Sequence, residues 1–212
     1  MGRERGFPMR RSTSFLMAAL GAGSWAASAH AQLPDSDDYT RYELLAPETA
    51  QFRIVYEVTA TATGAAFYFN PIRKGSEASD EAVYDRASGK PLRFEVVSGT
   101  DARAAGEKDA DLDTRYIKVE LPRPVPAGGE LRLRIDKTYR DPKSYFAEAG
   151  RIVFSRSLGV KRNAVVLPAG YELVACNVPA QVLQEPDGRV KVSFINPGPD
   201  AASVVVKGRR LP

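Results

Sequence analysis

The sequence has very little histidine, tryptophan or cysteine: its 212 residues include one of each. The histidine, His30, and the tryptophan, Trp25, both lie within the first 31 residues. The rest of the chain therefore has no imidazole for a Ser-His-Asp triad, a Cys-His pair or a histidine-rich zinc site. It also has no G-x-S-x-G, S-x-x-K or phosphate-loop motif. These absences exclude most hydrolase mechanisms.

The first 31 residues have the pattern of a secretory signal peptide. Four basic residues come first: Arg3, Arg5, Arg10 and Arg11. The apolar stretch that follows, residues 15–27, is shorter than the roughly 20 apolar residues of a membrane-spanning helix. Ala29-His30-Ala31 then supplies the small-x-small pattern of a cleavage site. We predict cleavage after Ala31 and export to the periplasm or the cell exterior, with an uncleaved anchor as the alternative.

Most of the positive charge belongs to this predicted leader. Residues 1–31 carry four Arg and one Glu, a net +3, and the whole chain is +4. The remainder is therefore close to +1, whereas nucleic-acid binding usually needs a strongly basic domain or stripe. No nucleic-acid partner is predicted.

The single cysteine, Cys176, lies in the apolar run 173–176. A lone cysteine cannot form an intramolecular disulfide, and free cysteines are among the most buried residues. We therefore expect Cys176 to pack in the core.

From residue 51 onward the chain reads as a series of short strands. Residues 52–58 and 131–136 alternate apolar and charged side chains, as half-buried strands do. Glycine and proline punctuate the runs, and no pattern of alternating helices is present. These features predict an all-β fold, an antiparallel β-sandwich of about 9–11 short strands. A helix over residues 77–86 is the alternative to a strand at 82–84.

Two prolines and an acidic stretch mark residues 32–50 as an irregular lead-in. The predicted organisation is therefore a signal peptide at 1–31, a lead-in at 32–50 and a single β-sandwich domain at 51–212.

Three aspartates, Asp109, Asp111 and Asp113, have the spacing of the first ligands of an EF-hand loop. Thr114, however, stands where that loop needs glycine, and the predicted strand at 116–120 would carry a later acidic ligand away. A solvated acidic loop is the favoured interpretation. A calcium site made of the three aspartates alone is the alternative, and no other cofactor is predicted.

A basic and aromatic segment lies between residues 139 and 162. It is predicted to form the binding surface for an anionic partner, with ordinary loops carrying solvated arginines as the alternative. The candidate binding residues are Tyr139, Arg140, Lys143, Tyr145, Arg151, Arg156, Lys161 and Arg162.

Two other functions are left open. Paired carboxylates could hydrolyse an envelope glycan, and Glu95, Glu120 and Glu172 lie on predicted strands. A structural envelope subunit could instead assemble through its edge strands.

Two hairpin-like stretches, residues 56–70 and 85–92, resemble the amino-terminal β-sandwich that precedes the catalytic domain of M1-type metallopeptidases and related exported bacterial proteins. In that family the zinc chemistry belongs to the following domain, with its H-E-x-x-H motif. That motif does not occur in this sequence, so no catalytic residue is carried over. The resemblance implies a non-catalytic sandwich. We therefore expect an exported, non-catalytic protein that binds an anionic glycan, a lipid head group or a protein partner in the bacterial envelope.

Overall fold

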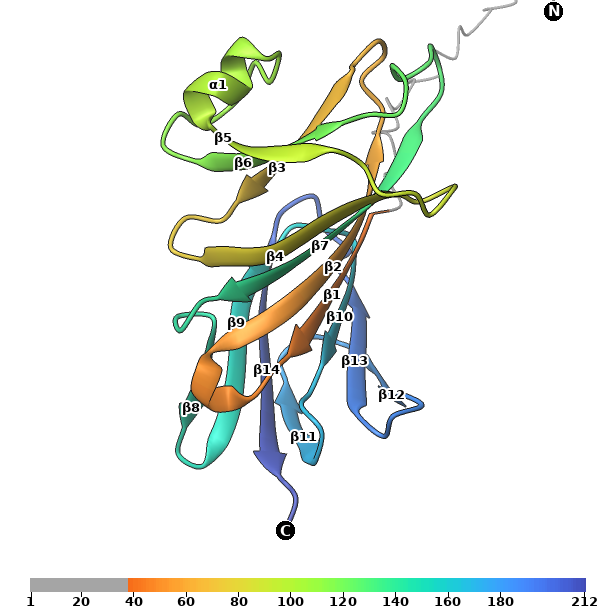
Figure 1. The fold of residues 1–212 in the computed structure, drawn as a ribbon. Helices are drawn as coiled ribbons and strands as arrows, with labels where there is room; N and C mark the ends of the chain where they lie inside the picture. Colours follow the sequence, from red (N-terminus) through yellow and green to blue (C-terminus); the bar gives the residue numbers. More distant parts are fainter. Residues whose placement is uncertain (1–37) are drawn as a thin grey trace, which may run out of the picture. The chain divides into compact units, whose positions relative to one another are not determined.

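The computed structural model describes residues 38–212, which form three β-sheets (Figure 1). The predicted signal peptide and the beginning of the lead-in lie outside the described residues. The strands are β1 (Tyr39–Leu44), β2 (Gln51–Ala60), β3 (Phe67–Ile72), β4 (Glu77–Asp85), β5 (Phe94–Ser98), β6 (Arg115–Glu120), β7 (Leu131–Arg140), β8 (Tyr145–Glu148), β9 (Arg151–Leu158), β10 (Arg162–Val166), β11 (Tyr171–Cys176), β12 (Gln181–Gln184), β13 (Val190–Ile195) and β14 (Ala202–Arg210). A 3-10 turn (Pro47–Thr49) and a short helix, α1 (Gly99–Ala104), complete the fold.

The largest sheet has seven strands in the order β12-β13-β10-β1-β2-β7-β4. Its strands pair antiparallel except for β1 and β10, which run parallel with Tyr42 beside Val165. Tyr39–Leu44 form a strand of this sheet, so the prediction of an irregular lead-in at residues 32–50 is wrong for that part. Thr40, Tyr42 and Leu44 alternate with less buried neighbours, as a strand inside a sheet requires.

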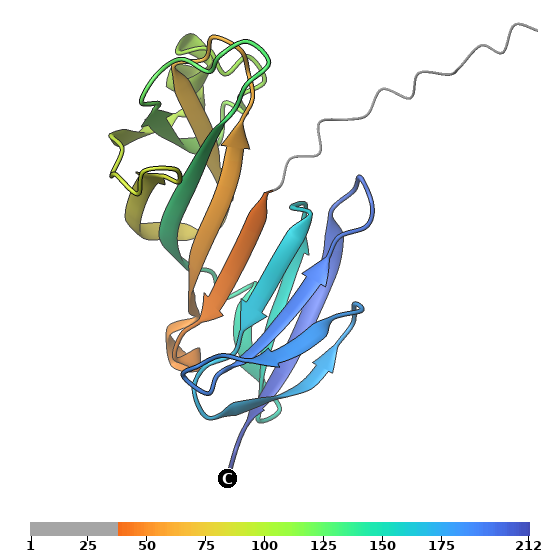
Figure 2. The same cartoon turned by 90° about the vertical axis from the view of Figure 1, so that its right-hand side faces the viewer.

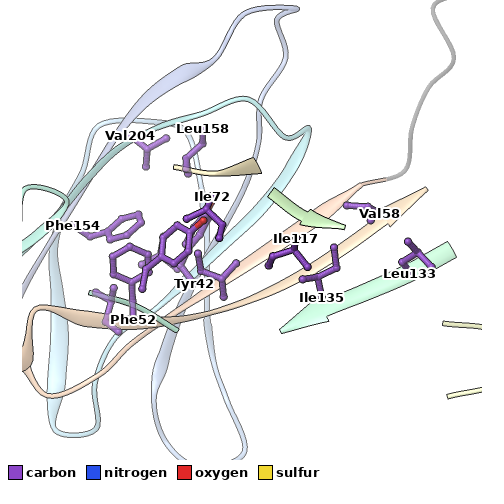
Figure 3. Close-up of a cluster of buried hydrophobic side chains, with 14 of the residues drawn as sticks. Tyr42, Phe52, Val58, Ile72, Ile117, Leu133, Ile135, Phe154, Leu158 and Val204 are labelled. Atoms are coloured by element: carbon purple, nitrogen blue, oxygen red, sulfur yellow. The ribbon is translucent and has the colours of Figure 1, made fainter. Parts of the chain in front are cut away.

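The two smaller sheets pack on the buried face of the large one (Figure 2). The four-stranded sheet, β11-β14-β9-β8, places Phe154 against Phe52, with ring centroids 5.5 Å apart. The three-stranded sheet, β3-β6-β5, places Ile117 near Ile135 of β7 (Figure 3). One continuous apolar core therefore runs beneath both small sheets.

The prediction of an all-β sandwich is confirmed. The structure has more strands than expected, partly because β1 and the four-residue β8 were not predicted. Residues 77–85 form β4, so the helix alternative is wrong. The short helix α1 was not predicted, and it begins where the Ser98 side chain accepts a hydrogen bond from the Asp101 backbone N–H. No helix in residues 38–212 is long and apolar enough to cross a membrane.

Candidate functional site

A pocket of about 400 Å³ lies where the two small sheets meet over the large one. This volume is within the range of small-molecule sites. We call it the junction pocket. It is lined by Thr40, Tyr42, Ile54, Tyr56, Tyr68, Asn70, Pro71, Arg73, Lys137, Tyr139, Arg156 and Val160.

The charge of this lining is of one sign. Its ionised side chains are Arg73, Lys137 and Arg156, and it includes no aspartate or glutamate. Lys137 and Arg156 are buried, at 5% and 8% exposed, while Arg73 is exposed at the mouth. Buried cations are costly unless an acid or hydrogen bonds compensate them, so the partners of Lys137 and Arg156 decide the character of the site.

Lys137 stands in the apolar row of β7. Alternate residues of this strand face the core, and Lys137 lies between the buried Ile135 and Tyr139. Its Nζ donates a hydrogen bond to Oδ1 of Asn70 on β3. Among the described residues no carboxylate forms an ion pair with Lys137. The partner of its charge is thus a neutral amide.

A β-bulge faces Lys137 from the neighbouring strand. Between the β4–β7 pairs Ser79–Thr138 and Ala82–Asp136, two residues of β4, Asp80 and Glu81, oppose this one lysine. Asp80 has a φ of 54°, in the left-handed region that non-glycine residues seldom adopt. Strained backbone and bulges are frequent beside functional sites.

Arg156 lies on β9 and lines the pocket, and it forms an ion pair with Asp141, which does not line the pocket. The Asp141 carboxylate accepts from Nη1 of Arg156 at 3.1 Å, from the Ser144 hydroxyl at 2.7 Å and from the Ser76 hydroxyl at 3.1 Å. The guanidinium also lies 5.4 Å from the ring centroids of Phe52 and Tyr139. Arg156 is thus compensated by an acid outside the pocket lining.

Four tyrosines form much of the wall. Asn70, which accepts from Lys137, also contacts the Tyr68 hydroxyl, and Tyr68 in turn bonds to Tyr56. The Tyr139 hydroxyl accepts from the backbone N–H of Arg73 at 3.2 Å. The walls therefore offer flat rings with polar tips.

Burial controls the ionisation of this site. Loss of solvent, together with the nearby charge of Arg156, lowers the pKa of Lys137 to about 7, and Glu81 partly offsets this. Burial raises the pKa of Tyr42 and Tyr68, so both stay neutral at neutral pH. Burial would also raise the pKa of Asp141, but hydrogen bonds from Ser144 and Ser76 hold it below its usual range.

The basic and aromatic segment predicted from the sequence does not form one surface. Tyr139, Tyr145 and Arg156 are buried, so they do not share one exposed surface with the other candidate residues. They face inward because they occupy the buried phase of their strands. Tyr145 lies outside the junction pocket, with its hydroxyl donating to the Leu45 carbonyl at 2.9 Å.

The other five residues of that segment are spread apart. Arg151 begins β9, while Lys161 and Arg162 follow the other end of the same strand. The seven residue-to-residue steps from Arg151 to Leu158, at roughly 3.3 Å each, make β9 about 23 Å long. Arg151 is therefore far from Lys161 and Arg162. Arg140 is paired with Glu77 at 3.6 Å, and Lys143 is exposed in the turn before β8.

The acidic loop at residues 109–113, considered above as a calcium site, has a lysine beside it. Nζ of Lys74 lies 2.9 Å from Oδ2 of Asp111 and 4.0 Å from Asp113. The hydrogen bond from Lys74 lowers the pKa of Asp111, and the charge of Lys74 adds to this. Within residues 38–212 no three Asp, Glu, His or Cys side chains lie close enough together to hold a metal ion. Asp109, Asp111 and Asp113 are therefore not grouped as a metal site in this structure.

The three glutamates considered for glycan hydrolysis are divided between two sheets. Glu95 and Glu120 share a small hollow of about 170 Å³, where Lys118 lies 2.9 Å from Glu95. Glu172 lies on β11 and pairs with Arg209. Cys176 is only partly buried, with its thiol near the Val178 carbonyl.

A larger hollow of about 790 Å³ lies along β10, β13 and the β11–β12 connection. Its lining is mainly apolar, and its one ionised side chain, Arg162, packs over the Tyr39 ring. We favour the junction pocket as the site because it combines buried charge, hydrogen-bonding groups and a strained neighbouring strand.

Lys137 and Asn70 were not among the binding residues predicted from the sequence. A signal for Lys137 was present, since the alternation that puts Leu131, Leu133 and Ile135 inward puts Lys137 inward as well. A lysine in the apolar phase of a strong strand is unusual enough to mark a site. Nothing in the sequence pairs Lys137 with Asn70, which lies 67 residues away.

Comparison with known proteins finds similarity of fold. No family model and no curated protein matches the sequence. An M1 zinc metallopeptidase from Deinococcus radiodurans matches 81% of this chain with a TM-score of 0.52 and 13% identity. Its E323A mutant bound to a Tyr-Ser-Ala substrate matches the same share with a TM-score of 0.52 and 14% identity.

This chain covers 41% of the length of those structures. The match therefore concerns one part of a longer protein, and at this identity it shows the fold alone. The expected resemblance is confirmed at that level: the described residues have a fold similar to the amino-terminal sandwich domain of M1 metallopeptidases.

Proposed function

We propose that this protein is an exported, non-catalytic β-sandwich module that binds an anionic ligand in the junction pocket. The observation that carries the proposal is the lining of that pocket, with three basic side chains and no acidic one. Two of the three are buried, so an anion there would meet charge that water screens weakly. The predicted leader supports export, and the absence of histidine after residue 31 supports a binding role.

The pocket also narrows the classes of ligand considered from the sequence. An anionic glycan, a lipid head group or an acidic protein segment could each present the anion. Because Lys137 and Asn70 lie in the pocket floor, the group that reaches them must be small or must project from its carrier. A flat acidic protein surface does not meet that condition.

A panel of small anions tests the proposal. We expect acetate, benzoate, phosphate or sulfate to raise the melting temperature of the purified protein, since ligands that bind the folded state stabilise it. The apparent affinity of Lys137→Met for these anions, obtained from the shift in melting temperature, should be lower by about tenfold or more. Lys143→Met is the matched control, because Lys143 is exposed and outside the pocket. If no anion acts on the protein, or if both variants respond equally, the proposal is wrong.

A second variant distinguishes the junction pocket from the surface predicted from the sequence. The triple change Arg151→Ala, Lys161→Ala, Arg162→Ala removes exposed or half-buried charges that do not line the pocket. We expect binding of the same anions to change less than about twofold, because distant surface charges are screened by salt. Loss of binding in the triple variant would place the site on the surface instead.

A further inference from the structure

The ionised groups around the junction pocket leave one buried positive charge without an acidic partner. The charge of Arg156 is matched by Asp141, with 3.1 Å between them. Lys137 has the amide of Asn70 and the ring of Tyr139, whose centroid lies 5.0 Å from Nζ, but no carboxylate ion pair among the described residues. Glu81, the nearest acid on β4, lines a different hollow. Lys137 is therefore the one buried cation of the lining that no carboxylate pairs with among the described residues.

The walls above this cation are suited to an apolar group. The rings of Tyr42, Tyr56, Tyr68 and Tyr139 surround the pocket together with Ile54. Aromatic side chains bury large apolar areas. The hydroxyls of Tyr56 and Tyr68 already contact one another, and that of Tyr139 accepts from the backbone. A small inorganic anion would reach Lys137 but leave the partly exposed rings of Tyr56 and Tyr68 in contact with water.

We infer that the junction pocket takes a monocarboxylate whose apolar body is about the size of a phenyl ring, with the carboxylate at Lys137 and the body among the tyrosines. The inference rests on the proposed function, because it names the ligand class for the same site. One negative charge matches Lys137, the one buried cation of the lining without a carboxylate partner. The second charge of a phosphate would have only the exposed Arg73 to meet it. The pocket volume, about 400 Å³, accommodates such a molecule.

Calorimetric titration with four probes tests this ligand class. The probes are benzoate, acetate, benzamide and inorganic phosphate, at about pH 6, where Lys137 is protonated. Acetate keeps the charge without the ring, and benzamide keeps the ring without the charge. We expect one benzoate to bind per chain, with an affinity about tenfold or more higher than that of acetate or benzamide. Phosphate should bind more weakly than benzoate.

Variants assign the binding to the pocket. In Lys137→Met, benzoate should lose about tenfold or more in affinity, while Lys143→Met should bind like the wild type. Tyr68→Ala should weaken benzoate but leave acetate within about twofold, because the ring contact concerns only the apolar body. Should Lys137→Met fail to fold, the Lys137 side-chain NMR signal of the wild type, which benzoate should shift, takes its place.

The outcomes separate this inference from the proposed function. If acetate or phosphate binds through Lys137 as tightly as benzoate, the proposal of an anion site is supported. The inference that the ligand is a monocarboxylate with an apolar body is then wrong. If benzamide matches benzoate, the site is apolar and both the inference and the anion proposal fail. If none of the four probes binds, both fail as well.

Discussion

Replacing Asp141 with alanine is expected to lower the free energy of unfolding by about 3–5 kcal/mol, because it leaves the buried charge of Arg156 without its acid. The same change removes the acceptor for the hydroxyls of Ser76 and Ser144. Arg156 cannot escape the charge by losing its proton at neutral pH, even though burial lowers its pKa. Urea unfolding followed by circular dichroism measures the effect.

A matched aspartate and a double variant provide the controls. Asp113 is exposed, and its carboxylate lies 4.0 Å from Lys74, so Asp113→Ala should change stability by less than about 0.5 kcal/mol. Adding Arg156→Met to Asp141→Ala should restore part of the loss, since the unpaired charge is then gone. Equal losses for Asp141→Ala and Asp113→Ala would show that Asp141 does not compensate a buried arginine.

Replacing Lys137 with methionine is expected to produce a stability difference that depends on pH. The folded protein lowers the pKa of Lys137 to about 7, against about 10.4 in an unfolded chain. Between these values the unfolded state binds more protons, so the stability of the wild type rises with pH. Below about pH 7 the wild type carries the full cost of the buried charge, on the order of 3–5 kcal/mol. Lys137→Met lacks that cost.

The predicted result is therefore a stability advantage of Lys137→Met that is largest near pH 6 and shrinks as the pH approaches about 10. The methionine variant also loses the hydrogen bond to Asn70, but that loss does not follow the titration of the lysine. The other charged groups around the site, Arg73, Arg156 and Glu81, are present in both proteins, so the difference isolates Lys137. Urea unfolding at several pH values gives the comparison.

Lys143→Met is again the control, and its difference from the wild type should be nearly independent of pH between about 6 and 9. A pH-independent difference for Lys137→Met as well would contradict the account. It would mean that Lys137 is solvated in the folded protein.

The strands were predictable where each carried its own pattern. Residues 52–58 and 131–136 alternate cleanly, and they form most of β2 and the first part of β7. β1 was missed because prolines and acidic residues surround a short run, and its place is fixed by distant partners. Its parallel neighbour, β10, lies about 120 residues later in the chain. Such pairing leaves no local signal.

The site was less predictable than the fold. Its side chains come from β1, β2, β3, β7 and β9, so their meeting depends on how three sheets pack. The sequence did show a concentration of basic and aromatic residues at 139–162. It did not show that Arg156 faces inward while Arg151 faces solvent, because the inward phase of β9 is set by its packing on Phe52.

The most direct test of the account is an NMR titration of Lys137 with protein labelled at the lysine ε-carbons, assigned by comparison with Lys137→Met. The account predicts that one lysine signal titrates near pH 7 and that benzoate moves its pKa upward, because a bound anion stabilises the charged amine. A Lys137 signal that titrates near about pH 10.4, as in an unfolded chain, and does not respond to benzoate would contradict it. The buried, uncompensated cation on which the proposed site depends would then not exist.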